Sequence, residues 1–486
     1  MEVYSDIAFG KGIKTHEPGA TPRAIPHMSF RHFSRRHFIK TGTMALPLAM
    51  AGCSGLQTRS ARARSKARDF VTVRDGRFEL RGGPCFYVGT NLWYGCYLCD
   101  PALPGGRQRL IRELDRLQLI GVNNIRLLAG SETSTLAGAI PRGITRSPDD
   151  WDEGLLRGLD FCLAEMARRD MRAILFLSNY WQWSGSFAQY VRWITGETIP
   201  DPDLPVMARG DWHGFMQFSA RFYANPAANE LYRDYVSQVI RRRNTVNGRL
   251  YRDDPAIMTW ELANEPRPGT DDDQTVDDVP LFVRWVDDTA RFIHEEAPHH
   301  LVCTGSEGIW GCLKKPDVFV QVHNTPAIDY VTVHMWLKNW GWLKDPQLSA
   351  EYDIAAGKAR DHVEQHTVLA TDTLHKPLVL EEFGLPRDHE KYAPGTPTTA
   401  RDDYFGRMFQ QVVDSCKAGR ALQGANFWTW GGEGRAGTGE PYSATVLTGD
   451  PPCEPQGLNS VFDSDTSTHR VIAQANEKLA AVARAA

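Results

Sequence analysis

Eight short apolar segments with high β-strand propensity recur along the chain, and segments with helical periodicity separate most of them. Near-continuous apolar strands that alternate with helices are typical of a parallel sheet buried on both faces. Eight such units close into a barrel. The sequence therefore predicts a single α/β domain, a (β/α)8 TIM barrel, over residues 69–486. Its strands are expected at residues 85–93, 124–129, 172–179, 257–264, 301–306, 330–336, 378–382 and 425–430.

The segments outside these strands also carry structural signals. Residues 70–80 alternate around Asp75-Gly76, which predicts an N-terminal β-hairpin that covers the N-terminal end of the barrel. Residues between the fifth and sixth strands show little helical periodicity. Residues 183–224 form a loop far longer than most strand–helix connections, so we expect it to wall a groove. Helices are expected at residues 107–119, 152–169, 230–243, 280–296 and 404–418, and from about residue 469.

Two glutamates end apolar strands within short motifs. Residues 259–266 read Thr-Trp-Glu-Leu-Ala-Asn-Glu-Pro, and residues 377–384 read Pro-Leu-Val-Leu-Glu-Glu-Phe-Gly. Glu265 ends the fourth strand and Glu382 ends the seventh, and the C-terminal strand ends of such a barrel meet at one mouth. Enzymes that hydrolyse a glycosidic bond typically use two carboxyl groups that face each other across it. The pair therefore predicts a retaining glycoside hydrolase.

The charge of the chain is divided unevenly. The formal net charge is −4, yet residues 1–68 contain twelve Lys and Arg against three Asp and Glu. The rest of the chain carries a net charge of −13. Because nucleic-acid binding requires a basic surface, this acidic body argues against a nucleic-acid partner.

The basic segment has the features of an export signal. Arg35 and Arg36 lie in a sequence that resembles the twin-arginine signal, and the apolar stretch 41–52 is too short for a permanent membrane span. Cys53 ends a sequence that resembles a lipoprotein cleavage box. We therefore expect residues 1–53 to be a signal with lipidation at Cys53. The alternative is an ordinary signal peptide with an incidental cysteine.

Two further expectations follow from this reading. Met28 would start a signal of more usual length, so translation could begin there. Residues 54–68, rich in Ser, Arg and Ala, are expected to form a flexible basic linker. The mature protein is expected to be a periplasmic or cell-surface monomer, attached to the membrane through its lipid.

The motifs of the barrel resemble those of glycoside hydrolase family 5, in the clan with the acid/base on strand four and the nucleophile on strand seven. The resemblance is strongest to the β-mannanase branch and extends over nearly all of residues 70–486. Besides the two glutamate motifs it rests on four sequences: Gly-Thr-Asn-Leu-Trp-Tyr at 89–94, Leu-Ser-Asn-Tyr-Trp-Gln-Trp-Ser-Gly at 177–185, His-Met-Trp-Leu-Lys-Asn-Trp-Gly-Trp at 334–342 and Phe-Trp-Thr-Trp-Gly-Gly-Glu-Gly-Arg at 427–435.

The resemblance implies a role for each residue at the mouth. Glu265 would be the general acid/base, with a raised pKa, and Glu382 the nucleophile. Asn264 would bind the sugar 2-hydroxyl, Arg126 would hold Glu382 ionised, and Trp428 would form the floor under the sugar at the cleavage point. The remaining candidates for substrate binding are His334, Trp336, Trp93 and Trp181, with Trp183, Trp340, Trp342 and Trp430 as further aromatic candidates.

Two details of these motifs generate expectations of their own. Trp336 stands where the family often has a Tyr that contacts the nucleophile, and an indole N–H can donate a hydrogen bond but cannot accept one. Glu381 precedes Glu382, and successive side chains of a regular strand point to opposite faces. We therefore expect Glu381 to point away from the mouth and to pair with a basic group behind the strand.

The function implied is a retaining endo-β-1,4-mannanase that cleaves mannan, glucomannan or galactomannan. The alternatives are a β-1,4-glucanase or an exo-acting β-mannosidase with the same catalytic residues, and a non-catalytic surface protein that binds glycans. Cys96 and Cys99 lack the additional ligands of a zinc site. No phosphate-binding loop or cluster of metal ligands is recognisable in the sequence, so we expect neither a metal nor another cofactor.

Overall fold

The computed structural model describes residues 69–203, 210–270, 278–436 and 442–486. The expected signal, the lipidation site Cys53 and the linker 54–68 lie outside these residues. Eight parallel strands form the central sheet, in the order β10-β9-β8-β5-β4-β13-β12-β11. They are β4 (Tyr87–Asn91), β5 (Asn124–Leu128), β8 (Arg172–Phe176), β9 (Ile257–Glu261), β10 (Leu301–Cys303), β11 (Val331–Met335), β12 (Leu378–Phe383) and β13 (Leu422–Phe427).

Hydrogen bonds that involve their flanking residues also connect β10 and β11, the two strands at the ends of this order. The amide of Asp329 donates to the carbonyl of Val302 at 2.9 Å, and the amide of His334 donates to the carbonyl of Glu307 at 3.3 Å. Every residue of the eight strands is buried, as expected for strands with helices outside and side chains inside. The predicted (β/α)8 barrel is confirmed.

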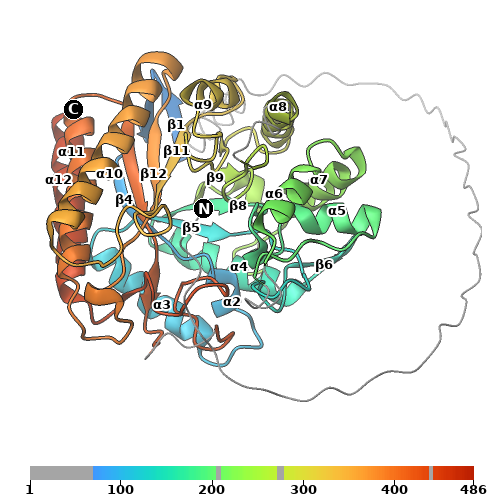
Figure 1. The fold of residues 1–486 in the computed structure, drawn as a ribbon, viewed down its shortest axis with the longest axis horizontal. Coiled ribbons are helices and arrows are strands. Elements are labelled where there is room, and N and C mark those ends of the chain that lie inside the picture. Colours follow the sequence, from blue (N-terminus) through green and yellow to red (C-terminus); the bar gives the residue numbers. More distant parts are fainter. Residues whose placement is uncertain (1–68, 204–209, 271–277, 437–441) are drawn as a thin grey trace, which may run out of the picture. The chain divides into compact units, whose positions relative to one another are not determined.

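Helices cover the outside of this sheet, with α10 to α12 on one side and α5 to α7 on the other (Figure 1). Several begin at a polar cap: the Asp152 side chain accepts a hydrogen bond from the Leu155 amide, and Ser349 accepts one from the Tyr352 amide. The helices after each strand are α3 (Gly106–Leu119), α4 (Glu153–Arg168), α7 (Pro226–Ile240), α8 (Val279–Glu296), α9 (Pro316–His323), α10 (Ala350–Val368), α11 (Thr399–Lys417) and α12 (Thr466–Ala485).

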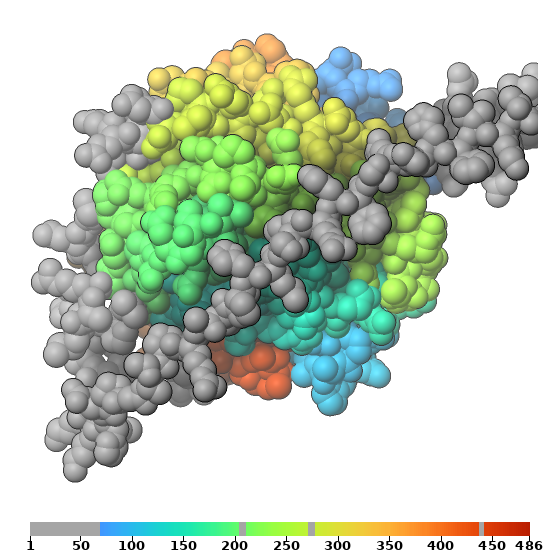
Figure 2. Space-filling view, turned by 90° about the vertical axis from the view of Figure 1, so that its right-hand side faces the viewer, coloured from blue at the N-terminus to red at the C-terminus, as the bar shows by residue number. Residues whose placement is uncertain are grey.

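Some helices were not predicted from the sequence. The segment 183–224 is not one long loop, because it contains α5 (Phe187–Thr195) and α6 (Trp212–Ala220). The unit between the fifth and sixth strands forms the short helix α9, and α10 precedes β12. The buried face of α10 mixes three alanines with polar and larger side chains, which gives only a weak periodic signal. Figure 2 shows segments from the middle of the chain, in green and yellow, covering one face of the molecule.

The predicted hairpin closes the N-terminal end of the barrel. It consists of β1 (Thr72–Arg74) and β2 (Arg77–Leu80), and β3 (Gly83–Pro84) extends it. Asp75 and Gly76 both have positive φ, the conformation that a tight hairpin turn requires. Phe78 is fully buried, with its ring 5.2 Å from that of Tyr330. The hairpin therefore seals one end, and the chemistry is confined to the other.

Smaller elements complete the described residues. Two short sheets pair β6 (Thr145–Ser147) with β7 (Asp150–Trp151) and β14 (Trp430–Gly432) with β15 (Val461–Phe462). A four-residue helix, α2 (Gly95–Leu98), follows β4. The eight cysteines of the described part are free thiols. No helix within that part has the length and apolar character needed to cross a membrane.

Candidate active site

The structure brings Glu265 and Glu382 together at the C-terminal mouth of the barrel. Carboxylate oxygens of these two residues and a ring nitrogen of His334 lie within 4.8 Å of one another. Both glutamates are buried, with 6% and 3% of their surfaces exposed. Glu265 has a φ of +50°, a strained backbone conformation for a residue with a Cβ atom. The amide of Glu265 donates to the Gly305 carbonyl at 2.8 Å, which helps to fix this conformation.

Arg126 links the strands that carry the site. Its guanidinium is fully buried and donates through Nη1 to Glu382 and, at 3.1 Å, to Asn91. Nη2 donates to Asn264 at 2.7 Å and to Glu261 at 2.6 Å, and Nε donates to Glu261 at 2.9 Å. An arginine has five N–H donors, so every one of them has an acceptor. Arg126 thus points into the mouth, as the resemblance implies.

His334 lies between the two glutamates. Its Nδ1 atom is 2.6 Å from an oxygen of Glu265 and 3.4 Å from an oxygen of Glu382. Burial disfavours the imidazolium, but the charge of Glu382 and the interactions with Glu265 and Glu381 outweigh it and raise the pKa of His334 to about 10. These contacts favour the protonated form of His334.

The contact with His334 reverses the order expected for the pKa values of the Glu265 and Glu382 carboxyl groups. Burial raises the pKa of Glu265, but the hydrogen bond and charge of His334, with Arg267 and Trp181, lower it below its usual value. Burial and the charge of Glu265 raise the pKa of Glu382 to about 7, although His334 and Arg126 oppose this. The expectation of a raised pKa for Glu265 is therefore wrong for this arrangement, because sequence did not reveal how close the imidazolium lies.

Glu381 does not point behind the strand as expected. The register of β11 against β12 passes from Val333–Leu380 to His334–Glu382, so Glu381 is an extra residue in a bulge. It lies inside the barrel, where its Oε2 is 3.7 Å from Nε of Arg126 and 3.7 Å from Nε2 of His334. The bulge breaks the alternation that the prediction assumed. Both glutamates consequently approach the same arginine and histidine.

Asn264 and Trp181 lie beside the predicted acid/base. The Asn264 side chain accepts from Arg126 and donates to Oδ1 of Asn179 at 3.1 Å, so its amide orientation is fixed. The indole Nε1 of Trp181 donates to Glu265. Trp181 is half-buried, and the guanidinium of Arg267 lies 4.9 Å from its ring. Trp181 therefore acts on Glu265 directly as well as offering an aromatic surface.

The remaining tryptophans divide into two groups. Trp428 is buried, with 4% of its surface exposed, and packs edge-on against Trp336 at 6.1 Å. Trp336 is half-buried at the mouth. Among the described residues, none accepts a hydrogen bond from the Trp336 indole, and either Trp336 or another group can supply the donor that the family's Tyr provides. Trp93 is fully buried and donates from Nε1 to the Gly449 carbonyl at 2.5 Å. Trp93 thus packs in the core, which argues against contact with a sugar, and its place in a subsite stays a prediction.

Packing contacts within the protein also occupy three further candidates, Trp340, Trp342 and Trp430. Trp430 is buried, and its indole donates to Glu113. Trp340 stacks on Trp310 with ring centroids 4.2 Å apart. Trp342 packs edge-on against Trp340 at 5.1 Å. These stacked and edge-on contacts indicate loop packing for this group.

Two polar pairs at the mouth were not predicted. Arg267 hydrogen-bonds Glu307, which follows β10, and burial raises the pKa of Glu307 to about 7. Asn339, in the segment after β11, hydrogen-bonds Glu454, in the segment between β14 and β15. Burial, and then the charges of neighbouring carboxylates that include Glu382 and Glu265, raise the pKa of Glu454 to about 8. For the pair of Asn339 and Glu454, the sequence offered one signal, the Asn within the motif at residues 334–342.

The cluster of Glu265, His334 and Glu382 has the composition of a possible metal site. The guanidinium of Arg126 and the imidazolium of His334 already place positive charge against both carboxylates. A metal ion would have to displace one of these groups from the carboxylates. The residues present therefore suit proton binding better than metal binding. The expectation of no metal remains a prediction.

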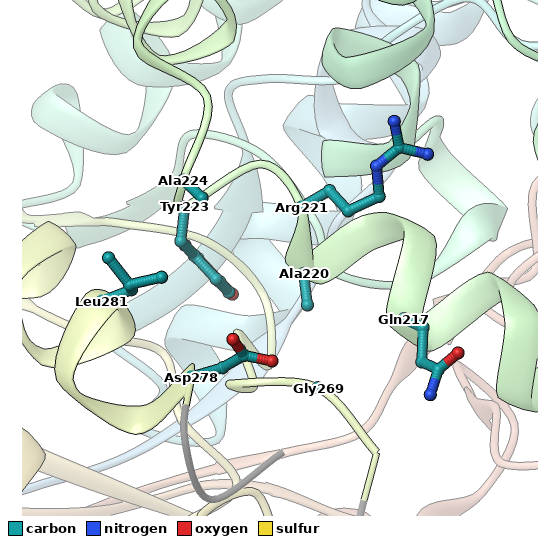
Figure 3. A pocket seen from close by; sticks show the side chains of 8 residues that line it. All are labelled: Gln217, Ala220, Arg221, Tyr223, Ala224, Gly269, Asp278 and Leu281. Atoms are coloured by element: carbon teal, nitrogen blue, oxygen red, sulfur yellow. The ribbon is translucent and has the colours of Figure 1, made fainter. Parts of the chain in front are cut away.

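A pocket of about 250 Å³ shares no residue with this site. It lies between α6, the segment after it and the start of α8 (Figure 3). Tyr223 and Asp278 extend toward its middle, whereas the guanidinium of Arg221 is directed away. The pocket therefore has no part in the convergence of the catalytic glutamates.

Comparison with known proteins places the chain in a family. Residues 68–484 match the family model described as glycoside hydrolase family 5 β-mannosidase-like. The chain belongs to this family. Over 390 residues it is 29% identical to a putative mannan endo-1,4-beta-mannosidase 4 of Arabidopsis thaliana, with 77% of this chain and 86% of that protein covered. Over 375 residues it is 28% identical to mannan endo-1,4-beta-mannosidase 1 of Solanum lycopersicum, with 74% and 83% covered.

Solved structures agree with this assignment. A glycoside hydrolase family 5 mannosidase from Rhizomucor miehei is 36% identical, with a TM-score of 0.77 and coverage of 86% of this chain and 100% of that chain. An endo-beta-1,4-mannanase from Thermotoga petrophila is 21% identical, with a TM-score of 0.59 and coverage of 81% and 77%. The second likeness supports the barrel fold alone.

Matched substitutions of Trp93 and Trp428 test the division among the tryptophans. Trp93→Leu should lower the free energy of unfolding by about 2–4 kcal/mol, because it removes buried volume and a hydrogen bond, and should leave kcat/KM on mannan within about threefold. Trp428→Leu should lower kcat/KM by at least about tenfold. Urea unfolding and initial rates provide the two readouts. A large loss of activity in the Trp93 variant with unchanged stability would show that Trp93 contacts substrate.

Proposed function

We propose that this protein is a retaining β-mannan hydrolase, acting as an endo-β-1,4-mannanase. The observation that supports it most strongly is the separation of the two carboxylates, whose nearest oxygens lie within 4.8 Å. Retaining glycosidases have carboxyl groups about 5–5.5 Å apart, whereas inverting enzymes need about 6.5–9.5 Å to admit a water molecule. The separation of the two carboxylates in this site agrees with the range for retention.

In the proposed reaction the proton that the raised pKa of Glu382 favours passes to Glu265 when substrate binds. Glu382 then attacks the anomeric carbon while Glu265 protonates the departing glycosidic oxygen. A glycosyl ester then links the sugar to Glu382, and Glu265 removes a proton from the water that hydrolyses it. Arg126 donates to Glu382 and keeps the attacking oxygen oriented. Asn264, held by Arg126 and Asn179, is positioned to bind the sugar 2-hydroxyl, and Trp428 to pack under the ring.

The choice of a mannan as substrate rests on the relatives. The proteins of Arabidopsis thaliana and Solanum lycopersicum carry the name mannan endo-1,4-beta-mannosidase. A variant of the Rhizomucor miehei mannosidase has been solved in complex with mannosyl-fructose. A β-mannoside differs from a β-glucoside by its axial 2-hydroxyl, which the corner formed by Arg126, Asn264 and His334 would have to accommodate.

Exo action by the same site is the second candidate, and one contact favours it. Asn339 and Glu454 hydrogen-bond each other from two segments that are far apart in the sequence, so these segments meet near the catalytic carboxylates. An endo-acting enzyme needs a groove open at both ends, whereas segments that meet beside the site can close one end. The 36% identical structure is also described as a mannosidase, without the prefix endo.

A panel of linear polysaccharides tests the substrate and separates the two modes of action. We expect strong release of sugars from glucomannan and little from carboxymethylcellulose. Early products of several sizes would support endo action, and mannose alone from the first minutes would support exo action. Equal rates on both polymers would contradict the mannan assignment. Protein that binds mannan but releases no sugar would identify a non-catalytic glycan-binding protein.

A trapping experiment tests the role of Glu382. A 2-fluoro-β-mannoside with a good leaving group should label the enzyme, and peptide mass spectrometry should locate the label on Glu382. Glu382→Gln should fold normally, take up no label and lose at least about 10³-fold in kcat, about 4 kcal/mol of transition-state stabilisation. Label on Glu381, or full activity of Glu382→Gln, would overturn the assignment.

We also propose that the protein is exported and attached to a membrane through a lipid on Cys53. The twin-arginine sequence and the cleavage-box resemblance support this. Replacing Arg35 and Arg36 by Lys should block export, and Cys53→Ala should release the exported protein from the membrane fraction. Cell fractionation with an antibody would measure both. Membrane retention of Cys53→Ala would exclude the lipid as the anchor.

A further inference from the structure

Beneath the catalytic glutamates lies a second pair of acidic side chains, Glu261 and Glu381. Both are fully buried inside the barrel, and their carboxylate oxygens and the Cys303 sulfur lie within 4.8 Å of one another. Gly305 makes room for this pair. A Cβ atom there would lie 2.2 Å from Oε1 of Glu261, and its φ of +75° also favours glycine.

The two members of this lower pair have different partners. Glu261 accepts two hydrogen bonds from Arg126. Glu381 accepts none, because all five donors of Arg126 are engaged, and both of its oxygens are buried without a hydrogen-bond partner. Nε2 of His334 is also buried without a partner, and it lies 3.7 Å from Oε2 of Glu381. The Glu381 carboxyl, which makes no hydrogen bond, thus lies at ion-pair distance from a ring nitrogen that makes none.

We propose that Glu381 is a positioning residue of the catalytic site that keeps His334 doubly protonated, with its Nδ1–H directed at Glu265 and Glu382. A buried carboxylate without hydrogen bonds is costly unless an opposite charge lies near it, and the imidazolium is the cation that has a free donor. The charge on Glu381 in turn stabilises the proton on Nε2. Glu381 therefore acts on the reaction through His334 and does not touch the sugar.

A metal ion does not fit the lower pair as well as a proton does. Both oxygens of Glu261 are occupied by the Arg126 guanidinium, whose charge would repel a cation. Burial raises the pKa of Glu261 to about 8, with Arg126 opposing and Glu381 adding to the rise.

The pH dependence of kcat/KM tests this proposal, which rests on the proposed hydrolase function. The charged and titratable groups around His334 and Glu381 include Arg126, Glu261, Glu265, Arg267, Cys303, Glu307 and Glu382, with the phenols of Tyr87 and Tyr330 beside Glu381. Glu381→Gln removes one negative charge from this cluster, so the cluster should lose its last proton at lower pH. The basic limb of the profile should move down by about one unit or more.

Two control variants accompany this measurement. Glu381→Asp keeps the charge, so its basic limb should stay near the wild-type position. Asp160→Asn makes the same change of charge at a buried carboxyl that binds Arg242 and Tyr251, outside the cluster, and should leave the limb unmoved. If Glu381→Gln lowers kcat/KM equally at every pH, Glu381 has only a structural role and the proposal is wrong.

The protonation of His334 can be read in the wild-type protein without a substrate. In a ¹⁵N-histidine spectrum, with the His334 signals identified by their loss in His334→Gln, both ring nitrogens should have imidazolium shifts at pH 7. A neutral ring at pH 7 would overturn the proposal even if Glu381→Gln failed to fold. A protein that hydrolyses no β-mannoside yet has this imidazolium would refute the proposed function alone.

Discussion

The fully satisfied guanidinium of Arg126 is the interaction on which the site depends. It connects β4, β9 and β12 through Asn91, the Glu261–Asn264 segment and Glu382. Burying an arginine costs several kcal/mol unless its charge is paired and its donors are used. Here all five N–H donors have acceptors, and the Glu261 and Glu382 carboxylates among them balance the charge. The same contacts bring Glu382 to the mouth, so the stability of the barrel interior and the geometry of the catalytic residues have one origin.

The site holds more negative than positive charge, and protons compensate for part of the difference. Four glutamates, at positions 261, 265, 381 and 382, contact or face the two cations Arg126 and His334. Like charges this close cannot all be ionised at once, so the pKa values of the group separate. The raised pKa of Glu382 and the lowered pKa of Glu265 are the result. Contact with a sugar oxygen would have to move a proton toward Glu265.

The sequence predicted the barrel well and the details of its mouth less well. Apolar strands buried on both faces leave a clear signal, and all eight were found. The helix α10 was missed because its buried face mixes alanines with polar residues such as His366 and Thr367, so its apolar periodicity is weak. Glu381 was misplaced because a bulge is set by the register between two strands, which a single sequence does not reveal. Trp93 and Trp428 occupy similar motifs, and only packing separates the core side chain from the one beside the half-buried Trp336.

The central claim is that the two carboxylates are close enough for double displacement, because Arg126 and His334 hold them there. The stereochemistry of hydrolysis tests this most directly. ¹H NMR of a β-linked manno-oligosaccharide, followed from the first minutes after enzyme addition, resolves the anomeric proton of the newly formed reducing end. The account predicts the β-anomer first, with the α-anomer appearing only through mutarotation. Initial formation of the α-anomer would indicate inversion and contradict the account.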